Sequence, residues 1–116
     1  MEDRINVYRQ GEVIPLTFSE FYYKGVLQTA IVDVFTFYFE IVKEDTRTSA
    51  LTVSDANMSI ADNGGTPTVV FDVATATLDE ETLYECELAM VHDASSDKVS
   101  LDTFFLRLRK PVATYP

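Results

Sequence analysis

The segment from Tyr84 to Arg109 constrains the fold of this chain most, because it has the pattern of two β-strands joined by a polar turn. Apolar and polar side chains alternate along both halves, and strand residues two apart lie on the same face of a sheet. Residues 93–97, Asp-Ala-Ser-Ser-Asp, supply the turn. The expected inward-facing side chains are Tyr84, Cys86, Leu88 and Met90 on the first strand, and Phe104, Leu106 and Leu108 on the second. A hairpin of this kind closes a β-domain.

The other apolar runs are also short and rich in β-branched and aromatic residues, which is typical of strands. They are Ile5–Arg9, Val13–Phe18, Thr36–Lys43, Ala50–Val53, Met58–Ala61 and Thr66–Val73. No window has a sustained helical period with caps. The sequence therefore predicts an all-β fold, an immunoglobulin-like two-sheet antiparallel β-sandwich of about seven to nine short strands, without the Cys, Trp, Cys signature of antibody domains. We expect one domain over residues 1–110 and a C-terminal tail over 111–116.

The run at 36–43 is expected to be a central strand, because large side chains occupy both of its faces. Phe35, Phe37, Phe39 and Ile41 share one face, which we predict to be the core side. Tyr38 and Glu40 then face outward.

Glycine, proline and polar residues mark the expected connections. Gly11 permits a bend between the first two runs, which are predicted to form a two-part edge strand because Pro15 is tolerated at an edge or a bulge. Lys24-Gly25 suits a tight turn, and Asn63-Gly64 is a strong hairpin signal. Residues 77–82 could form one helical turn, although a crossover between the sheets is the favoured interpretation.

Length and composition allow one packed core that needs neither a metal nor a disulfide. A chain of 116 residues buries roughly two-thirds of its unfolded surface, and 47% of its residues are hydrophobic. Cys86 is the only cysteine, so no disulfide can form within the chain, and its alternating position predicts a small core residue.

The charged N-terminus lacks the apolar run of a secretory signal, and the stretch from Val26 to Val42 is too interrupted to cross a bilayer. We therefore expect a protein made in soluble form.

The charge of the chain is unevenly distributed. Its formal net charge is −10, and residues 48–97 hold ten acidic residues and no Lys or Arg, whereas the rest of the chain holds nine of each sign. Phosphate backbones repel such a surface, and no basic stripe with interleaved aromatics is present. This excludes direct nucleic-acid binding. The acidic segment is interpreted as a solubilising face, or else as a docking face for a basic partner or for cations.

Residue types that could carry chemistry occur, but not in patterns that select a reaction. His92 stands beside Asp93, yet the sequence places no nucleophile near it, so we interpret it as a turn residue. Asp93 with Asp97, and Asp62 with Asn63, lack the spacing of a calcium loop, and Asx turns explain them more simply. The glutamates are interpreted as a solvated edge rather than a glycosidase pair; they are Glu80, Glu81, Glu85 and Glu87. We predict no catalytic residue, no metal site and no cofactor.

Aromatic residues near loops and chain ends are the better functional candidates, because exposed Tyr and Phe usually contact a partner. The predicted interaction residues are Tyr8, Phe21, Tyr22, Tyr23 and Tyr115. Self-association or docking in an assembly would use them, and sugar stacking is the lesser possibility.

Taken together, the strand and turn patterns resemble the N-terminal domain of phage baseplate upper proteins and related small immunoglobulin-like phage domains. The resemblance extends over nearly the whole chain. It rests on Ile5-Asn6-Val7-Tyr8-Arg9-Gln10-Gly11-Glu12 followed by Ile14-Pro15-Leu16, on Asp62-Asn63-Gly64-Gly65, on Leu78 ahead of Tyr84, and on Phe104-Phe105-Leu106-Arg107-Leu108 with Val112. The chain departs from the family at the aromatic turn of residues 21–25, where small polar residues are usual.

The resemblance implies a virion component that is made in the bacterial cytoplasm and incorporated into a tail, a baseplate or a head surface. Such a subunit acts by assembly with other virion proteins and with itself, through an edge strand within residues 5–18 or through the tail. We expect a non-enzymatic structural subunit that binds neither nucleic acid nor membrane, and for which a small-molecule ligand is not anticipated. The alternative is a β-sandwich module that binds carbohydrate or a cell-surface ligand.

Overall fold

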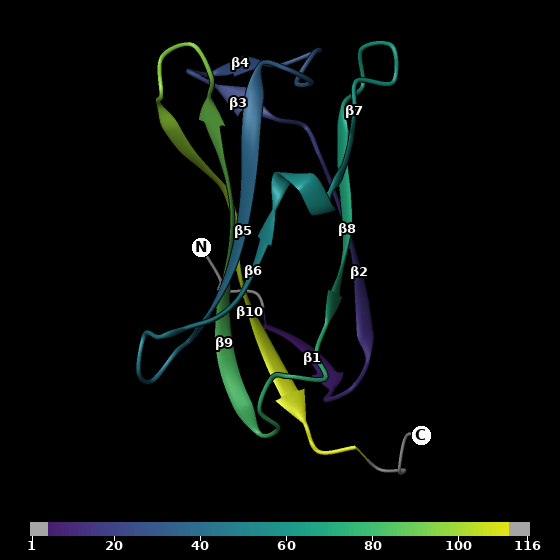
Figure 1. The fold of residues 1–116 in the computed structure, drawn as a ribbon, viewed down its shortest axis with the longest axis vertical. Coiled ribbons are helices and arrows are strands. Elements are labelled where there is room, and N and C mark those ends of the chain that lie inside the picture. Colours follow the sequence, from purple (N-terminus) through teal and green to yellow (C-terminus); the bar gives the residue numbers. More distant parts are fainter. Residues whose placement is uncertain (1–4, 112–116) are drawn as a thin grey trace.

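The structure is a computed structural model that describes residues 5–111, and it confirms the predicted all-β class (Figure 1). Within this range it has ten strands and one short 3-10 helix. The strands are β1 (Ile5–Arg9), β2 (Val13–Ser19), β3 (Tyr22–Tyr23), β4 (Val26–Leu27), β5 (Phe35–Lys43), β6 (Ser49–Ser54), β7 (Ser59–Ala61), β8 (Thr68–Ala74), β9 (Thr82–His92) and β10 (Lys98–Arg109), and the helix is η1 (Asp55–Asn57).

The strands form two facing sheets and a small hairpin (Figure 1). The larger sheet has the order β1-β10-β9-β5-β6, the smaller has the order β2-β8-β7, and β3 pairs with β4 alone. All neighbours pair antiparallel except β1 and β10, which run parallel. The expectation of a purely antiparallel fold is therefore wrong at this one pair.

The first two strands belong to different sheets, which corrects the predicted two-part edge strand. The chain leaves β1 at the edge of the larger sheet, turns at residues 10–12 and enters β2 at the edge of the smaller one. Gly11 has a φ of 100°, which suits glycine, and its N–H donates to Thr75 Oγ1 at 2.9 Å. The Thr75 hydroxyl in turn donates to the Glu12 carbonyl at 2.6 Å, so this fully buried side chain fixes the crossing. Pro15 lies on an edge strand, as predicted.

The core lies between the two sheets and follows the alternation expected from the sequence. All four predicted side chains of β5 are buried, as are the predicted inward residues of β9 and β10, Cys86 among them. The smaller sheet covers them with Ile14, Val69, Phe71 and Val73. Tyr38 is exposed on the outer face of β5, as expected. The period of two therefore located the core of these strands correctly.

The predicted connections are confirmed except for the possible helical turn. Lys24 and Gly25 have φ values of 51° and 78° in the β3–β4 turn, the combination that a type I′ hairpin needs. β7 and β8 pair across residues 62–67. Residues 75–81 contain no helix and cross between the sheets, as the favoured interpretation predicted. The Asp79 N–H in this segment donates to the hydroxyl of buried Tyr84 at 2.7 Å. No helix in the described part of the chain has the length and hydrophobicity to span a membrane.

Candidate functional site

One end of the molecule is formed by the β3–β4 hairpin and three neighbouring connections (Figure 1). These are the loop over residues 28–34, the β7–β8 turn and the β9–β10 turn over residues 93–97. We call this end the tip. It gathers three of the five aromatic residues predicted to bind a partner, Phe21, Tyr22 and Tyr23, and it also holds the only histidine of the chain.

The three consecutive aromatics at the tip alternate between the core and the surface. Phe21 is 1% exposed and packs edge-on against Phe37, with ring centroids 5.5 Å apart. Phe21 therefore cannot contact a partner, which corrects its assignment as an interaction residue; it anchors the hairpin because its side chain points into the core. Tyr22, one residue later, is 52% exposed, and Tyr23 turns back toward Phe35 and His92.

Four apolar side chains remain exposed at the tip, and we call them the tip patch. They are Tyr22, Val26, Leu27 and Val32, with exposed fractions of 52%, 61%, 48% and 40%. Tyr22 and Leu27 are cross-strand partners on the hairpin. Val26 pairs with Tyr23 and therefore lies on the opposite face of the hairpin from Tyr22 and Leu27. β3 and β4 pair only with each other. The sequence predicted Tyr22 as an interaction residue but not the three aliphatic residues. Two of these, Val26 and Leu27, directly follow the Lys24-Gly25 turn, and this position was a sign that they would be exposed.

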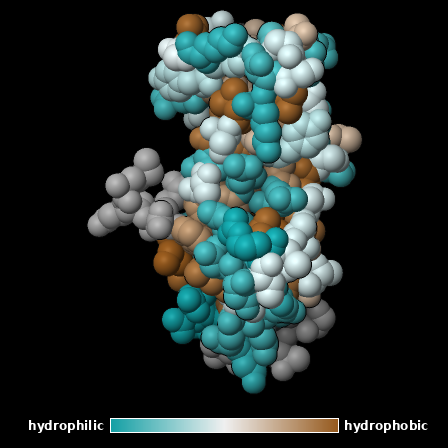
Figure 2. All heavy atoms as spheres, turned by 90° about the vertical axis from the view of Figure 1, so that its left-hand side faces the viewer, coloured by the Kyte–Doolittle hydropathy of each residue, from teal (hydrophilic) through white to brown (hydrophobic). Residues whose placement is uncertain are grey.

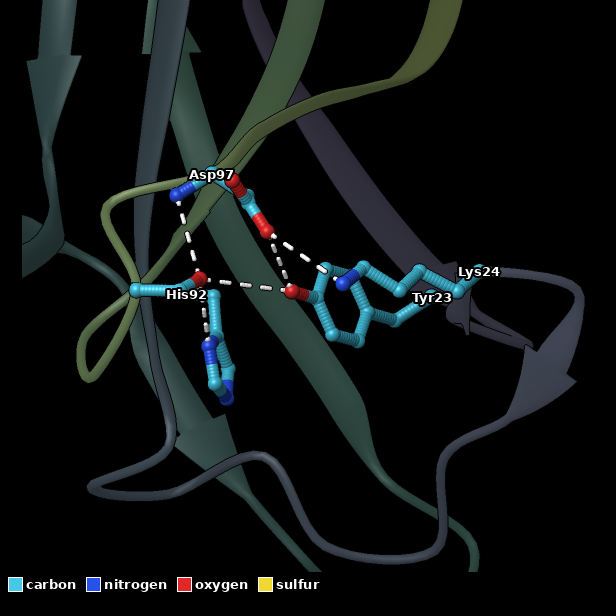
Figure 3. Close-up of polar contacts among 5 residues, drawn as sticks. Tyr23, Lys24, His92 and Asp97 are labelled. Carbon is cyan, nitrogen blue, oxygen red and sulfur yellow. Dashed lines mark hydrogen bonds and ion pairs between the residues drawn. The ribbon is translucent and has the colours of Figure 1, made fainter.

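A set of polar contacts, which we call the clip, holds the β3–β4 hairpin against the β9–β10 turn (Figure 3). The Tyr23 hydroxyl donates to Asp97 Oδ2 at 2.7 Å and lies 3.3 Å from Ser95 Oγ. The Tyr23 ring stacks on His92, with centroids 4.8 Å apart and planes inclined by 22°. Lys24 Nζ stands 3.7 Å from Asp97 Oδ2. Tyr23 is thus engaged within the protein, and its role is to orient the hairpin that presents the tip patch.

The charge on Asp97 is stabilised by this arrangement. The Tyr23 hydroxyl bond is the main cause that lowers the pKa of the carboxyl group below its usual value, and the contacts from Ser95 and Lys24 act in the same direction. Asp97 is therefore ionised at neutral pH and accepts the clip bonds. The site is solvent-exposed, so these bonds position the loops and add little to stability.

His92 lies near a hydroxyl group, but the surrounding geometry is that of a turn. Its Nδ1 is 2.8 Å from Ser95 Oγ, a contact that the sequence alone did not indicate. A nucleophilic serine also needs a group that orients the imidazole and a protected position for the reacting atom. The hydrogen bonds within residues 5–111 include none between a carboxylate and His92, and Ser95 Oγ also accepts the Asp97 N–H at 3.3 Å. The pair can order the turn, and the described geometry offers no catalytic triad.

The acidic turn residues bind backbone and hydroxyl groups. Asp62 Oδ1 accepts the N–H groups of Ile31 at 2.6 Å and Val32 at 3.1 Å, so it ties the β7–β8 turn to the loop after β4. Asp93 Oδ1 accepts the Thr36 hydroxyl at 2.6 Å. Across residues 5–111 no group of three or more His, Cys, Asp or Glu side chains is placed to hold a metal ion. These aspartates therefore brace the loops of the tip.

Cations from outside the acidic segment partly neutralise it. Lys43 Nζ lies 2.7 Å from Asp79 Oδ2, Arg47 Nη1 lies 2.7 Å from Glu85 Oε1, and Lys98 Nζ lies 3.9 Å from Glu87 Oε1. The hydrogen bond that Lys43 donates to the Asp79 carboxylate is the main cause that raises the pKa of Lys43. Figure 2 shows the side of the molecule on which the larger sheet lies: hydrophilic residues cover most of it, and hydrophobic residues occur in small separate groups.

The two remaining predicted interaction residues lie away from the tip. Tyr8 is half-buried on β1 and packs against the core, so it is not the freely exposed ring that its position near the chain end suggested. Tyr115 lies outside the described residues. Neither a protein-family model nor a curated protein sequence matches the chain.

Proposed function

We propose that this chain is a non-enzymatic interaction subunit built on an immunoglobulin-like sandwich. The strand order supports this. In the larger sheet, β10, β9, β5 and β6 have the same order as strands G, F, C and C′ of an immunoglobulin variable domain, and in the smaller sheet β2, β8 and β7 have the order of its strands B, E and D. In such domains the loops at one end of the sandwich commonly carry the binding residues, because a rigid scaffold holds them in place. The tip is the corresponding end.

The observation that carries the proposal is the tip patch. Four apolar side chains are exposed on one small hairpin and its following loop, and water solvates such apolar surface poorly. The clip and the Asp62 bonds hold this surface in a fixed orientation. A preorganised apolar patch with an aromatic residue is a typical anchor for a protein partner, because little side-chain entropy is lost when it binds.

A second surface supports self-association through the edge of the larger sheet. Ile5 and Val7 are each 53% exposed on β1, which has no proline and is an edge strand. The other strand at this side, β2, has Pro15 in its middle, and proline cannot donate a hydrogen bond to an added strand. On this side of the molecule, strand addition by a second copy therefore favours β1 over β2, with Val7 near the contact.

We propose that the partners are other virion proteins and that the subunit becomes part of a phage tail, baseplate or head surface after synthesis in the bacterial cytoplasm. The support for this placement is the resemblance of the strand and turn pattern to phage baseplate upper protein domains. The tip patch supports the mode of action, which is assembly.

Self-association is tested with two matched variants. Val7→Lys and Val13→Lys each add a charge at an exposed valine of an edge strand, and the two valines are 53% and 59% exposed. We expect light scattering on the purified full chain to show a concentration-dependent dimer or larger oligomer that Val7→Lys weakens at least tenfold and Val13→Lys leaves unchanged. A wild-type chain that stays monomeric at millimolar concentration contradicts edge-strand assembly.

The partner is tested through the genes that flank the gene for this chain. We expect them to encode tail or capsid proteins, and at least one of those proteins to co-purify with the wild-type chain when the two are produced together. The double variant Tyr22→Ser with Leu27→Ser should lose this partner, whereas Val13→Ser, an equally exposed apolar position away from the tip, should keep it. Flanking genes of unrelated metabolism would exclude the virion assignment, and a partner that the double variant still binds would exclude the tip patch.

A further inference from the structure

A recess of about 250 Å³ lies between the two sheets, on the side where β1 and β2 form neighbouring edges. Its residues come from six strands, so no local pattern in the sequence indicates it. The apolar part consists of Ile14, Leu16, Phe18, Phe39, Ile41, Val73, Cys86, Phe104 and Leu106, and the polar part consists of Asn6, Tyr8, Thr17 and Asp102. It is separate from the tip.

The recess follows from the crossing of the chain between the sheets. β1 and β2 meet at the turn over residues 10–12, where Thr75 fixes them, and each then continues in its own sheet. Neither strand pairs with the other, so the two sheets are not closed by backbone bonds along this side. The inward side chains of the two edges, including Tyr8, Leu16 and Phe18, consequently remain only partly buried.

Most of the wall is apolar, and Asp102 is the one charged residue of the lining. Phe39 and Phe104, with ring centroids 6.2 Å apart, and Ile41 are buried side chains that contribute carbon surface to the recess. Cys86 belongs to the same wall, and burial raises the pKa of its thiol to about 12, so it stays neutral at physiological pH. Protein interiors are close-packed, and apolar cavities of about 150 Å³ already admit a benzene ring. A space of this size and lining favours a ring system of one or two rings.

The polar residues of the recess can form hydrogen bonds with a bound molecule. Asn6 and Tyr8 come from β1, Thr17 from β2, and Asp102 from β10 on the same face as Phe104. The amide, phenol and hydroxyl groups of the first three can donate or accept hydrogen bonds. Mostly apolar walls with a few convergent polar groups are the usual composition of a small-molecule site.

We propose that this recess is a binding site for a small, largely apolar molecule that carries one or two aromatic rings and a single hydrogen-bonding group. The ring occupies the space beside Phe39 and Phe104, and the polar group lies among Asn6, Tyr8 and Thr17. The site does not depend on partner binding at the tip, since it shares no residue with the tip patch; Asn6 and Tyr8 do belong to the β1 edge that we assign to self-association.

The test is a titration of the full chain with indole, followed through the methyl signals of isotopically labelled Ile, Leu and Val residues. Saturable shifts are expected at Ile14, Ile41, Val73 and Leu106, which line the recess, and not at Val32, which is exposed at the tip. Glycerol at the same concentrations, as a polar comparator, should produce no such shifts. An absence of saturable shifts at the four recess residues, up to the solubility limit of indole, overturns the proposal.

A variant that fills the recess tests whether indole binds there. Leu16→Trp adds a ring at a half-buried position of the recess, and the matched control Val70→Trp adds the same ring on the outer face of β8. Leu16→Trp should weaken indole binding at least tenfold, whereas Val70→Trp should leave it unchanged. Equal binding by a folded Leu16→Trp chain overturns the assignment. If that variant does not fold, the wild-type titration decides the proposal.

Discussion

Two neighbouring aromatic residues at the tip should respond to mutation in opposite ways. The Phe21 side chain is almost fully buried and contacts Phe37, whereas the Tyr22 side chain is half-exposed and pairs across the hairpin with Leu27. Phe21→Ala removes a core ring and leaves a cavity, which costs about 3–5 kcal/mol of unfolding free energy. Tyr22→Ala loses one cross-strand contact, which costs less than about 1 kcal/mol.

Urea denaturation of the two single variants measures this difference. A domain of this length has a total stability of roughly 6–17 kcal/mol, so Phe21→Ala should still fold at low temperature. With an m-value of about 2 kcal/mol/M, its midpoint should fall by roughly 2 M, while that of Tyr22→Ala should move by less than about 0.5 M. Partner binding should show the reverse order, with Tyr22→Ala the weaker binder at a temperature where both chains are folded. A loss of stability in Tyr22→Ala equal to that in Phe21→Ala would refute the assignment of the two rings to opposite faces.

Three further outcomes follow from the buried thiol and from the loops of the tip. The pKa of Cys86 is raised to about 12 in the folded chain and is about 8.5 when unfolded, so the stability contributed by its neutral thiol is present at neutral pH and declines as the pH rises between these values. The urea midpoint of the wild type should therefore fall above pH 9 more steeply than that of Cys86→Ala. The lowered pKa of Asp97 means that the clip is intact above the ordinary carboxyl pKa and is lost as the pH falls through the folded value. Tyr23→Phe should raise the pKa of Asp97 in a carboxyl NMR titration, and an unchanged value would exclude the hydroxyl bond as its main cause. Asp62→Ala removes the acceptor of two backbone N–H groups, so it should cost about 1–2 kcal/mol and accelerate amide exchange in the loop over residues 28–34, whereas Asp62→Asn, which keeps an oxygen acceptor, should do so much less.

The strands were predictable from the sequence because alternation is a local property. Most residues of β5, β9 and β10 face the core or the solvent according to their position in a period of two, a pattern that depends on no distant residue. The exceptions are Ala89, which is buried between Leu88 and Met90, and the irregularity between Ser100 and Asp102. The sheet that a strand joins is a different matter, because it depends on pairing with residues far along the chain. Ile5–Arg9 and Val13–Phe18 look like one interrupted strand, yet the turn at Gly11 sends them to different sheets.

The candidate site was only partly predictable for the same reason. The sequence showed that Phe21, Tyr22 and Tyr23 must alternate, but the direction of the alternation depends on where Phe37 and the core lie. The partners of Tyr23 come from a turn some 70 residues later in the chain. The recess requires six strands to be in place, so it has no counterpart in any sequence window.

The parallel pairing of β1 with β10 has a consequence for the order of folding. Residues 5–9 pair with residues 105–109, so β1 cannot form its ladder until β10, about 100 residues later in the chain, is present. Pairing across such a sequence distance carries a large loop-closure entropy, which slows folding and raises the contact order of the whole domain. The edge that we assign to assembly is then completed only after β10 is in place, so a chain cannot polymerise through a finished β1 edge before residues 105–109 have been synthesised.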